Sequence, residues 1–370
     1  MYLRRDRDER RHLLSRKTLT PGSMQFNPPR ICPSLLLRET ENQFGLTGDL
    51  RPLEGEREQN QLLTLSDGRA FVLKVSSATE DTARVDFLIH ALRHLARVAP
   101  HLPVSRVVPR LDGGYAGEVA GPGGERHLIR LLTYMPDVLY AQGQPPTLAG
   151  LHEIGRIGGR LCRAFHGYSH PAARRFMPWD MTNGLLGSEE LWRHGTEDIR
   201  KHEKALRPLF TRLFDEHTRD LRQQVTHHDL HPMNLLRADH TSVAVTGVID
   251  FSDMVEAPLI CDLAILAWGF IGCDDPVEAI VTVVQGYHEN QPLTVREIMI
   301  VCDLILARAV QFVLLTDFRL KATDDPPAFT QDRPDYMANV ERWLEVDRSE
   351  VQARLLAVCA LDNSSRSKVL

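Results

Sequence analysis

Three polar side chains in the second half of the chain have the types and the spacing that phosphoryl transfer requires. Asp229 and Asn234 belong to the segment V-T-H-H-D-L-H-P-M-N-L-L, and Asp250 ends the apolar run V-T-G-V-I, sixteen residues after Asn234. In phosphoryl-transfer enzymes an aspartate of one loop meets the acceptor hydroxyl, while an asparagine and a second aspartate hold Mg²⁺. Base and metal ligands act on opposite sides of the transferred group, so this loop and the following hairpin must converge in space.

Each of these residues also has a purely structural explanation. Asp229 could cap the turn before Pro232, and Asn234 could be a turn residue. Asp250 is harder to explain in this way, because a carboxylate at the end of an apolar strand is costly without a partner, which Mg²⁺ would supply. We interpret Asp229 as the catalytic base, or as the group that orients the acceptor hydroxyl, and Asn234 and Asp250 as metal ligands. We place His227 with the catalytic residues as a brace that holds the loop by hydrogen bonds.

The histidines around Asp229 allow a second interpretation, as a zinc or iron site. His227, His228 and His231 lie within five residues of one another. That is too close for several of them to reach one ion unless other elements contribute, and the Pro232-x-Asn234 pair has no role in such a site. A metallohydrolase is therefore the weaker alternative.

The elements that must position these residues change in character along the chain. Strand and turn patterns dominate residues 50–132, with a helical pattern from Asp81 to Arg97, and helical patterns dominate after residue 148. We expect helices at 148–166, 188–218, 259–270, 276–289, 294–318, 336–344 and 349–360. This order predicts an α+β, protein-kinase-like fold with two lobes: an N-lobe built on an antiparallel sheet and a mainly helical C-lobe.

The composition along the chain also suggests its division into domains. The first forty residues are polar and then rich in proline, which is typical of a tail and linker. We therefore predict a disordered N-terminal extension at 1–40, a nucleotide-binding N-lobe at 41–135, and a C-lobe with the catalytic loop and metal site at 136–362. The last residues, 363–370, are expected to form a tail.

Several residues of the N-lobe are candidates for binding the nucleotide. Lys74 has apolar neighbours in a predicted strand that precedes a helix, which is where a lysine would contact the α- and β-phosphates, although a lone lysine on a strand is usually a solvated edge residue. The loop from Gly55 to Asn60 would cover the phosphates, but it contains a single glycine. Leu132 and Tyr134 lie where the chain passes between the lobes, and we expect their backbone to meet the base.

The acceptor has weaker candidates. Trp179 and Asp180 would form part of its pocket, with Asp180 taking a substrate ammonium group, but a helix cap with a packed tryptophan explains them equally well. Asp253 is either a second acidic group near the metal or a helix cap. Glu256 and Asp262 are further acidic candidates for a cationic substrate.

The composition excludes several other classes of protein. A net charge of −5 argues against a nucleic-acid partner. We expect no apolar run of membrane-spanning length, and the six scattered cysteines without a C-x-x-C pair are typical of reduced thiols in a cytoplasmic protein. The arginine-rich start also contains acidic residues and has no apolar segment, so it predicts neither a secretory signal nor a transit peptide. The sequence contains no indication of the oligomeric state.

The motifs resemble the aminoglycoside phosphotransferase/choline kinase-like group, and within it the hydroxylysine kinase branch. The broad resemblance depends on H-H-D-L-H-P-M-N and V-I-D-F-S-D, and it covers about residues 42–345. The closer one depends on the following segments: F-G-L-x-G-x-L-R-P-L-x-G-E-R-x-Q-N (44–60), F-V-L-K-V-S (71–76), V-D-F-L-I-H-A-L-R-H-L-A (85–96), and G-V-I-D-F-S-D-M with A-P-L-I-C-D-L-A (247–264).

The resemblance implies roles for the same residues. Asp229 would be the catalytic aspartate, Asn234 and Asp250 the Mg²⁺ ligands, and Lys74 the phosphate-binding lysine. The donor would be ATP or, as the closer branch implies, GTP. The acceptor would be a hydroxyl of a small amino alcohol or hydroxy amino acid, with 5-hydroxylysine as the first expectation.

The chain departs from the pattern of the group at three positions. It has H-H-D where H-G-D is usual, so His228 adds bulk beside the base, and D-F-S-D in place of D-F-G-D. Leu88 stands where a helix acid would pair with Lys74, which leaves Asp86 as the nearest substitute. Two other functions therefore stay open: an aminoglycoside-type phosphotransferase, and a catalytically degenerate kinase fold that acts as a binding module.

Overall fold

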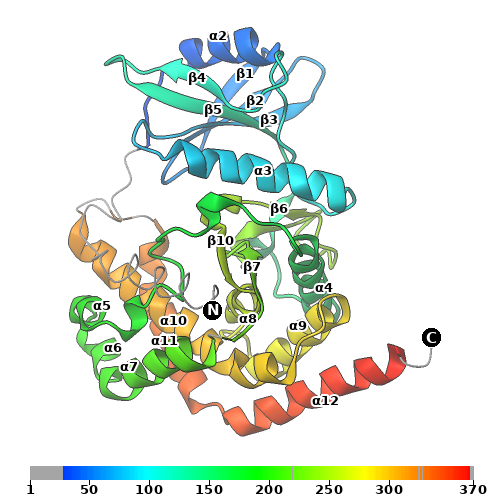
Figure 1. The fold of residues 1–370 in the computed structure, drawn as a ribbon, viewed down its shortest axis with the longest axis vertical. Coiled ribbons are helices and arrows are strands. Elements are labelled where there is room, and N and C mark those ends of the chain that lie inside the picture. Colours follow the sequence, from blue (N-terminus) through cyan, green and yellow to red (C-terminus); the bar gives the residue numbers. More distant parts are fainter. Residues whose placement is uncertain (1–27, 219, 324–325, 327, 367–370) are drawn as a thin grey trace, which may run out of the picture.

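The computed structural model describes residues 28–366, except 219, 324–325 and 327. These residues form two lobes, an upper one built on a β-sheet and a larger, mainly helical lower one (Figure 1). The prediction of a two-lobed, kinase-like α+β fold is confirmed. The predicted disorder of residues 1–27 lies outside the described residues.

The upper lobe is organised by an antiparallel sheet with the strand order β1-β2-β3-β5-β4. Its strands are β1 (Asp49–Leu53), β2 (Gln59–Thr64), β3 (Ala70–Val75), β4 (Gly117–Ala120) and β5 (Arg126–Thr133). Along β3 the buried residues alternate with half-buried ones, so that Phe71, Leu73 and Val75 enter the core of this lobe while Lys74 lies on the opposite face. The period-2 pattern thus points Lys74 away from the core formed with α2.

Helix α2 (Pro33–Phe44) corrects the predicted N-terminal extension, which was wrong from residue 33 onward. Pro33 occupies the first turn, where a missing amide costs nothing, and Gly45 ends the helix with a φ of 68°. Leu36, Thr40 and Phe44 recur every fourth residue and are buried, the first and last of them on the sheet. A proline that suggests a linker therefore marks the start of a helix.

Helix α3 (Thr82–Val98) lies between the sheet and the lower lobe (Figure 1). It begins at Asp81, whose side chain accepts a hydrogen bond from the amide of Ala83. Leu88, where a helix acid was expected, is 4% exposed and packs into the same core as the lower lobe. The helix therefore joins the two lobes by apolar contact.

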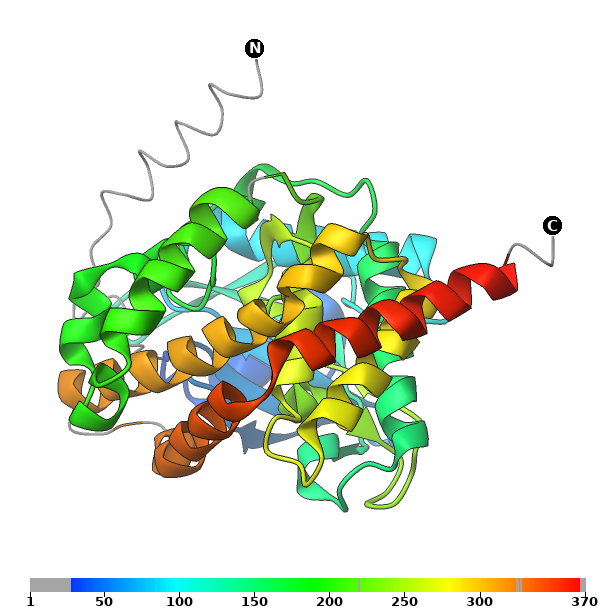
Figure 2. The same ribbon diagram turned by 90° about the horizontal axis from the view of Figure 1, so that it is seen from below.

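The lower lobe consists mainly of helices, seen from below in Figure 2, where α12 crosses the lobe. They are α4 (Leu148–Ala164), α5 (Glu189–His194), α6 (Glu197–Arg200), α7 (Glu203–Arg212), α8 (Ile260–Trp268), α9 (Pro276–Asn290), α10 (Val295–Ala322), α11 (Arg333–Glu345) and α12 (Arg348–Arg366). Short turns of 3₁₀ helix are η2 (Tyr140–Gln142), η3 (Pro171–Ala173), η4 (Leu185–Gly187), η6 (Pro232–Asn234), η7 (Phe251–Asp253) and η8 (Ala328–Asp332), and η5 (Leu213–His217) is a π-helical turn.

Two predicted helix boundaries in this lobe were wrong. The single helix expected at 188–218 is divided, because Gly195 ends α5 and Thr196 starts α6. At the other end of the lobe α12 continues to Arg366, so the tail predicted from residue 363 starts too early. Extending a helix that already exists costs far less than starting one, so polar residues can follow its last buried turn.

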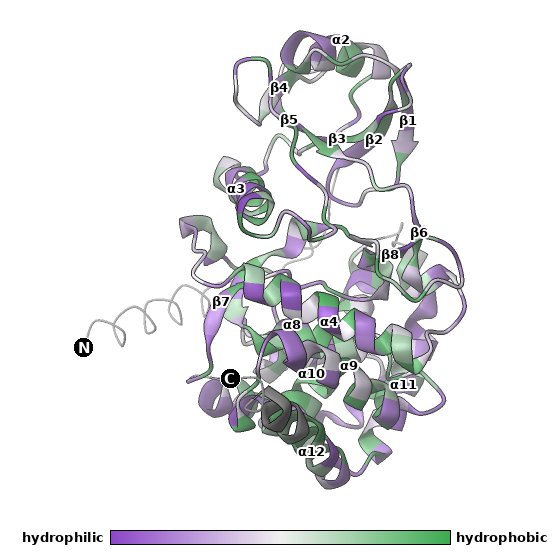
Figure 3. Cartoon of the chain, turned by 90° about the vertical axis from the view of Figure 1, so that its right-hand side faces the viewer, coloured by the Kyte–Doolittle hydropathy of each residue, from purple (hydrophilic) through white to green (hydrophobic). Residues whose placement is uncertain are grey.

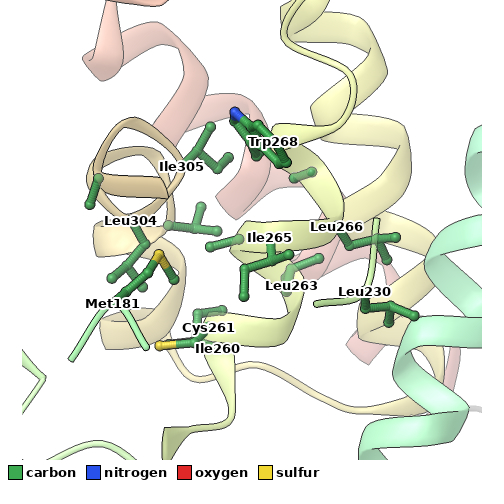
Figure 4. Close-up of a cluster of buried hydrophobic side chains, with 14 of the residues drawn as sticks. Met181, Leu230, Ile260, Cys261, Leu263, Ile265, Leu266, Trp268, Leu304 and Ile305 are labelled. Atoms are coloured by element: carbon green, nitrogen blue, oxygen red, sulfur yellow. The ribbon is translucent and has the colours of Figure 1, made fainter. Parts of the chain in front are cut away.

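Helix α10 is the core of the lower lobe. It has 28 residues, begins with a capping box between Thr294 and Glu297, and packs against α8, α11 and α12. By length and composition it is apolar enough to cross a membrane, so the expectation that no such run exists was wrong. Yet 83% of its most apolar stretch is buried inside the protein, as expected for a core helix. Figure 4 shows this packing, with Leu304 and Ile305 of α10 facing the side chains of α8.

Short strand pairs frame the two loops that carry the expected catalytic residues. β7 (Gln223–Thr226) pairs with β10 (Val255–Pro258), and β8 (Leu235–Arg237) pairs with β6 (Val138–Leu139) and β9 (Gly247–Val248). One loop connects β7 to β8 and the other connects β9 to β10, so both begin and end in paired strands. Figure 3 shows β6 and β8 on the side of the lower lobe that faces the sheet.

Glycines allow α4 and α9 to cross at close range beneath these loops. A Cβ atom on Gly155 would lie 2.1 Å from the carbonyl oxygen of Val283, and one on Gly286 would lie 2.1 Å from that of His152. A Cβ on Gly158 would meet Leu230 of the loop between β7 and β8 at 3.6 Å, so this crossing also supports that loop.

We expect Gly155→Ala to lower the free energy of unfolding by about 1–3 kcal/mol, because the new methyl group would push two backbones apart. Urea unfolding followed by circular dichroism measures the change. Arg163→Ala, at an exposed position of α4, is the control, and equal stabilities of the two variants would contradict the close crossing.

Candidate active site

The loop between β7 and β8 is held from below by the carboxylate of Asp262, in the first turn of α8. Its two oxygens accept the amides of His227 at 2.9 Å and of His228 at 2.7 Å. Asp262 is 1% exposed, and burial raises its pKa even though both histidines oppose the shift. It therefore fixes the backbone just before Asp229. The suggestion that it takes a cationic substrate was wrong, because it is enclosed by the loop that it supports.

His227 connects this loop to the segment that carries Asp250. Its Nδ1 accepts the amide of Asp229 at 3.3 Å, which leaves the proton on Nε2, and Nε2 lies 3.0 Å from the carbonyl oxygen of Ile249. The ring packs on Phe251 with 4.6 Å between centroids. These contacts are those of a brace and occupy both ring nitrogens, so His227 has no nitrogen left for proton transfer to a substrate.

His228 has a left-handed backbone, with a φ of 64°. Glycine adopts this conformation freely, which explains why the related motif is H-G-D, and histidine is one of the residues that tolerate it at some cost. The His228 ring is fully buried, with Nδ1 3.1 Å from the hydroxyl of Thr226 and Nε2 3.4 Å from Asp180. The extra bulk noted in the sequence thus points into the protein and away from solvent.

Both oxygens of the Asp229 carboxylate are engaged. Oδ2 accepts the side-chain amide of Asn234 at 2.8 Å, and Oδ1 accepts Nη2 of Arg308 at 3.0 Å. His231 lies 3.4 Å from Oδ1. The carboxylate is half-buried and its orientation is set by three neighbours, as an acceptor-orienting group requires.

Arg308 comes from the middle of α10 and was not predicted from the sequence. Its guanidinium lies between the rings of Trp179 and Trp268, at 5.4 and 5.5 Å, and Nη1 donates to the backbone oxygen of Trp179 and to Gln311. Burial lowers the pKa of Arg308, and Asp229 opposes that shift. The signal that could have found it is an arginine in the apolar run L-I-L-A-R-A-V, because an arginine is rarely fully buried without a partner.

The expected metal ligands come from two segments that are joined by a backbone hydrogen bond. The amide of Ile249 donates to the backbone oxygen of Asn234 at 3.0 Å, which places Asp250 next to Asn234. Asp250 has a φ of 56° and is exposed to solvent between the lobes, and its Oδ1 accepts the amide and the hydroxyl of Ser252. Surrounding protein raises the pKa of Asp250, but Lys74 and Ser252 lower it more. Because the side-chain nitrogen of Asn234 donates to Asp229, its side-chain oxygen is left for a ligand. That oxygen and the Asp250 carboxylate are of the kind that Mg²⁺ prefers.

Lys74 has an acidic partner that the sequence analysis missed. Its Nζ lies 3.2 Å from Oε2 of Glu58, next to the start of β2, and Arg130 of β5 donates to both oxygens of the same carboxylate at 2.8 and 2.9 Å. Glu58 is 5% exposed; burial would raise its pKa, but Arg130 and Lys74 hold it well below the usual range. Asn60 pairs with Lys74 in the sheet, so Glu58, two residues away, lies on the same face. The spacing identifies Glu58 only once the register of the two strands is known.

Asp86, the predicted substitute partner of Lys74, lies elsewhere on α3, so that prediction was wrong. It contacts His90 at 3.5 Å and His170 at 3.2 Å, a group with ligand atoms near enough for a metal ion. However, Nδ1 of His170 accepts the amide of Ala172, so Nε2 carries the proton and donates to Asp86. We therefore interpret this group as hydrogen-bonded side chains.

The loop between β1 and β2 contacts the lower lobe. Gly55 is required there, because a Cβ would lie 2.4 Å from the backbone oxygen of Glu58, and Asn60 closes the loop by donating to the backbone oxygen of Glu54. At its tip Arg57 donates to Asp253. Burial would raise the pKa of Asp253, but Arg57 is the main cation that holds it low. The side chain of Asn60 therefore shapes the loop, and Asp253 receives a cation from the protein itself.

A second contact joins the same loop to the lower lobe, because Glu56 pairs with Arg319 of α10. Arg319 is 4% exposed, and burial lowers its pKa to about 10. The loop that was expected to cover the phosphates is thus attached to the lower lobe at two adjacent residues.

The residues that were predicted to contact the nucleobase and the acceptor have partners within the protein. The amide of Tyr134 donates to the oxygen of Ala70 at 3.1 Å, and Leu132 lies within β5 opposite Val72, so the amide of Tyr134 is not available to a nucleobase. Trp179 and Asp180 are 6% and 1% exposed. They lie behind the catalytic loop, against Arg308 and His228, so the prediction that Asp180 takes a substrate ammonium group directly was wrong.

Comparison with known proteins agrees with this geometry. A model of the phosphotransferase enzyme family, APH, matches residues 49–298. The chain belongs to this family. It is 26% identical over 311 residues to a hydroxylysine kinase from Danio rerio, covering 80% of this chain and 86% of that protein. It is 22% identical over 307 residues to the hydroxylysine kinase of Mus musculus, covering 75% and 80%. The resemblance stated from the motifs is confirmed.

Solved structures show the same fold. A microcompartment-associated aminopropanol kinase superposes with a TM-score of 0.66 at 18% identity, over 86% of this chain and 99% of that one. The amicoumacin kinase hAmiN, in complex with AMP-PNP, Ca²⁺ and Ami, superposes with a TM-score of 0.61 at 16% identity, over 87% and 93%. The family assignment makes this chain a small-molecule kinase, a phosphotransferase with an alcohol group as acceptor.

We expect Glu58→Gln to lower the free energy of unfolding at pH 7 by about 3–5 kcal/mol, because Lys74 and Arg130 would lose their buried countercharge. The pKa of Glu58 is lowered by folding, so its contribution is complete above the ordinary value of 4.5 and is lost as the pH falls below it. The difference between wild type and variant should therefore shrink in acid. Urea unfolding at several pH values measures it.

Glu118→Gln is the matched control for this prediction, because Glu118 forms an exposed pair with Arg126 at the edge of the same sheet. A screened surface pair contributes little, so its loss should be small at every pH. Equal losses in the two variants, or a difference that does not change with pH, would show that Glu58 is not held as described.

Proposed function

We propose that this kinase transfers the γ-phosphoryl group of ATP or GTP to a hydroxyl of a small amino-bearing metabolite, an amino alcohol or a hydroxy amino acid, with 5-hydroxylysine first among them. The observation that carries the proposal is the Asp229 carboxylate, which is held by Asn234 and Arg308. The two hydroxylysine kinases that match most of the chain support this acceptor class. The same reasoning assigns the nucleotide to the N-lobe at 41–135 and the acceptor to the C-lobe at 136–362.

Asp229 would accept a hydrogen bond from the acceptor hydroxyl and take its proton as the bond to phosphorus forms. Its two oxygens are already oriented by Asn234 and Arg308, so little rearrangement is needed. Asn234 and Asp250 carry oxygens of the kind that Mg²⁺ binds, and this ion would neutralise charge on the donor phosphates. Lys74, held by Glu58, would contact the α- and β-phosphates.

The structure bears on the alternative of a degenerate binding module. Its support was the missing helix acid and the glycine-poor loop, but Glu58 supplies the acid from the sheet. A drug-inactivating phosphotransferase remains the second candidate, since it would use the same Asp229, Asn234 and Asp250. The four buried cysteines, none of which forms a disulfide, agree with a cytoplasmic protein, which we propose as its location.

We expect nucleoside diphosphate release with Mg²⁺ to depend on the acceptor, with the highest kcat/KM for 5-hydroxylysine among hydroxylysine, choline, ethanolamine, homoserine and an aminoglycoside. Asp229→Asn should lower kcat by roughly 10²–10⁴-fold, because it removes the proton acceptor. It should still bind the nucleotide. Running each acceptor with ATP and with GTP identifies the donor.

Asp239→Asn is the matched control, because Asp239 accepts hydrogen bonds from Thr241 and Ser242 in an exposed turn. Its turnover should equal that of the wild type. An aminoglycoside as the best acceptor would favour the second candidate. Nucleotide binding without any turnover would favour a binding module, and unchanged turnover in Asp229→Asn would refute the assigned base.

A further inference from the structure

Arg57 brings a positive charge from the upper lobe to the two loops that carry the expected catalytic residues. It stands at the tip of the loop between β1 and β2, and its guanidinium donates to Asp253, three residues after Asp250. The Arg57 and Asp253 side chains are only 17% and 13% exposed. A cation from one lobe is thus enclosed against a carboxylate of the other.

Arg57 interacts electrostatically with acidic residues of both loops that carry the expected catalytic residues. Burial would lower its pKa, but Asp253, Asp250 and Asp229 together raise it. The guanidinium is therefore within electrostatic range of the expected metal ligand and of the expected base. In an in-line transfer, the phosphoryl group passes between groups in these two roles.

The loop is built to keep Arg57 at this place. Gly55 allows the tight turn, Asn60 closes it through the backbone oxygen of Glu54, and Glu56 is attached to Arg319 of α10. The neighbouring arginines are used differently. Arg84 and Arg175 both donate to the backbone oxygen of Ser252, so they hold the main chain of the loop between β9 and β10, which carries Asp250.

We propose that Arg57 is a ligand of the γ-phosphoryl group, and that Asp253 is the partner it holds until the donor binds. The inference rests on the proposed function. Phosphoryl oxygens offer a guanidinium the same planar, charge-assisted pairing as a carboxylate. Exchanging Asp253 for these oxygens would place positive charge where it accumulates in the transition state.

Arg57 takes no part in bond making, bond breaking or proton transfer. The bond between the γ-phosphorus and the oxygen that bridges it to the β-phosphate breaks, and a bond forms between the acceptor oxygen and the γ-phosphorus. The acceptor proton passes to Asp229, and the nucleoside diphosphate leaves with the electron pair of the broken bond. Arg57 keeps its protons and stabilises charge on the oxygens of the group in transit.

The test compares the affinity of the protein for a diphosphate and for a triphosphate analogue. With Mg²⁺ present, dissociation constants for ADP and AMP-PNP, or GDP and GMP-PNP if GTP is the donor, are measured by calorimetry on the full chain. In Arg57→Ala the triphosphate analogue should bind at least tenfold more weakly, whereas the diphosphate should change by less than about twofold, because only the former carries the γ-phosphoryl group. Arg57→Lys should be intermediate.

A second variant separates this role from that of a simple latch between the lobes. Asp253→Asn breaks the same ion pair but keeps the guanidinium, which no longer has to leave a carboxylate when the donor binds. The preference for the triphosphate analogue over the diphosphate should therefore be at least as large as in the wild type. If Arg57→Ala and Asp253→Asn weaken both nucleotides equally, Arg57 is only a latch and the inference fails. Arg69→Ala, in the exposed turn after β2, is the control for loss of one positive charge from this lobe.

Nucleotide binding by the wild-type protein tests the proposed function separately from the role of Arg57. If the wild-type protein binds neither nucleotide, the proposed function fails and the inference fails with it. If it binds both and Arg57→Ala leaves the ratio unchanged, the proposed function stands and only the role of Arg57 is refuted. Thermal unfolding of each variant shows whether any loss of binding reflects loss of folding.

Discussion

The pairing of Arg308 with Asp229 is the contact on which the arrangement of the lower lobe depends. A guanidinium in the middle of a 28-residue core helix is costly without a countercharge and hydrogen-bond acceptors nearby. Asp229 supplies the charge, Trp179 and Gln311 supply acceptors, and the rings of Trp179 and Trp268 enclose the cation. The rotation of α10 and the position of the catalytic loop are therefore fixed together, because neither can shift without exposing a buried charge.

Backbone strain is concentrated at the same place. Among the described residues, His228 and Asp250 are the non-glycine residues with positive φ. His228 directly precedes the expected base, Asp229, and Asp250 is itself an expected metal ligand. Such conformations cost of order 1–3 kcal/mol each and persist only when surrounding contacts impose them. Asp262 imposes the first by accepting two successive amides, and Ser252 supports the second. Apolar packing of α8 in turn holds Asp262 in place. The free energy of packing in the core therefore offsets the backbone strain of the loop that carries Asp229.

The sequence was sufficient for the long periodic helices and for the residues that are close together along the chain, but not for α2 or for the division of residues 188–218 into short helices. Hydrophobic periodicity located α8, α9 and α10, and the spacing within residues 225–250 was enough to single out Asp229, Asn234 and Asp250. It could not supply their partners, because Arg308, Glu58 and Arg57 come from segments whose distance from the loop depends on strand register and helix packing. Where local chemistry had two meanings, as at Pro33 or Asp180, only tertiary burial decided between them.

Charge pairing distinguishes the contacts near the expected site from those elsewhere between the lobes. Along α3 the lobes share mainly apolar packing. Over the expected site they meet through ion pairs, Arg57 with Asp253 and Glu56 with Arg319. Arg84, in the first turn of α3, adds a hydrogen bond to the backbone oxygen of Ser252. Apolar contact has no directional requirement, so it can persist while the lobes adjust. An ion pair can instead be exchanged for another anion at little cost, because the incoming phosphate repays the lost partner. The apolar packing along α3 therefore holds the lobes together without depending on the ion pairs above the expected site.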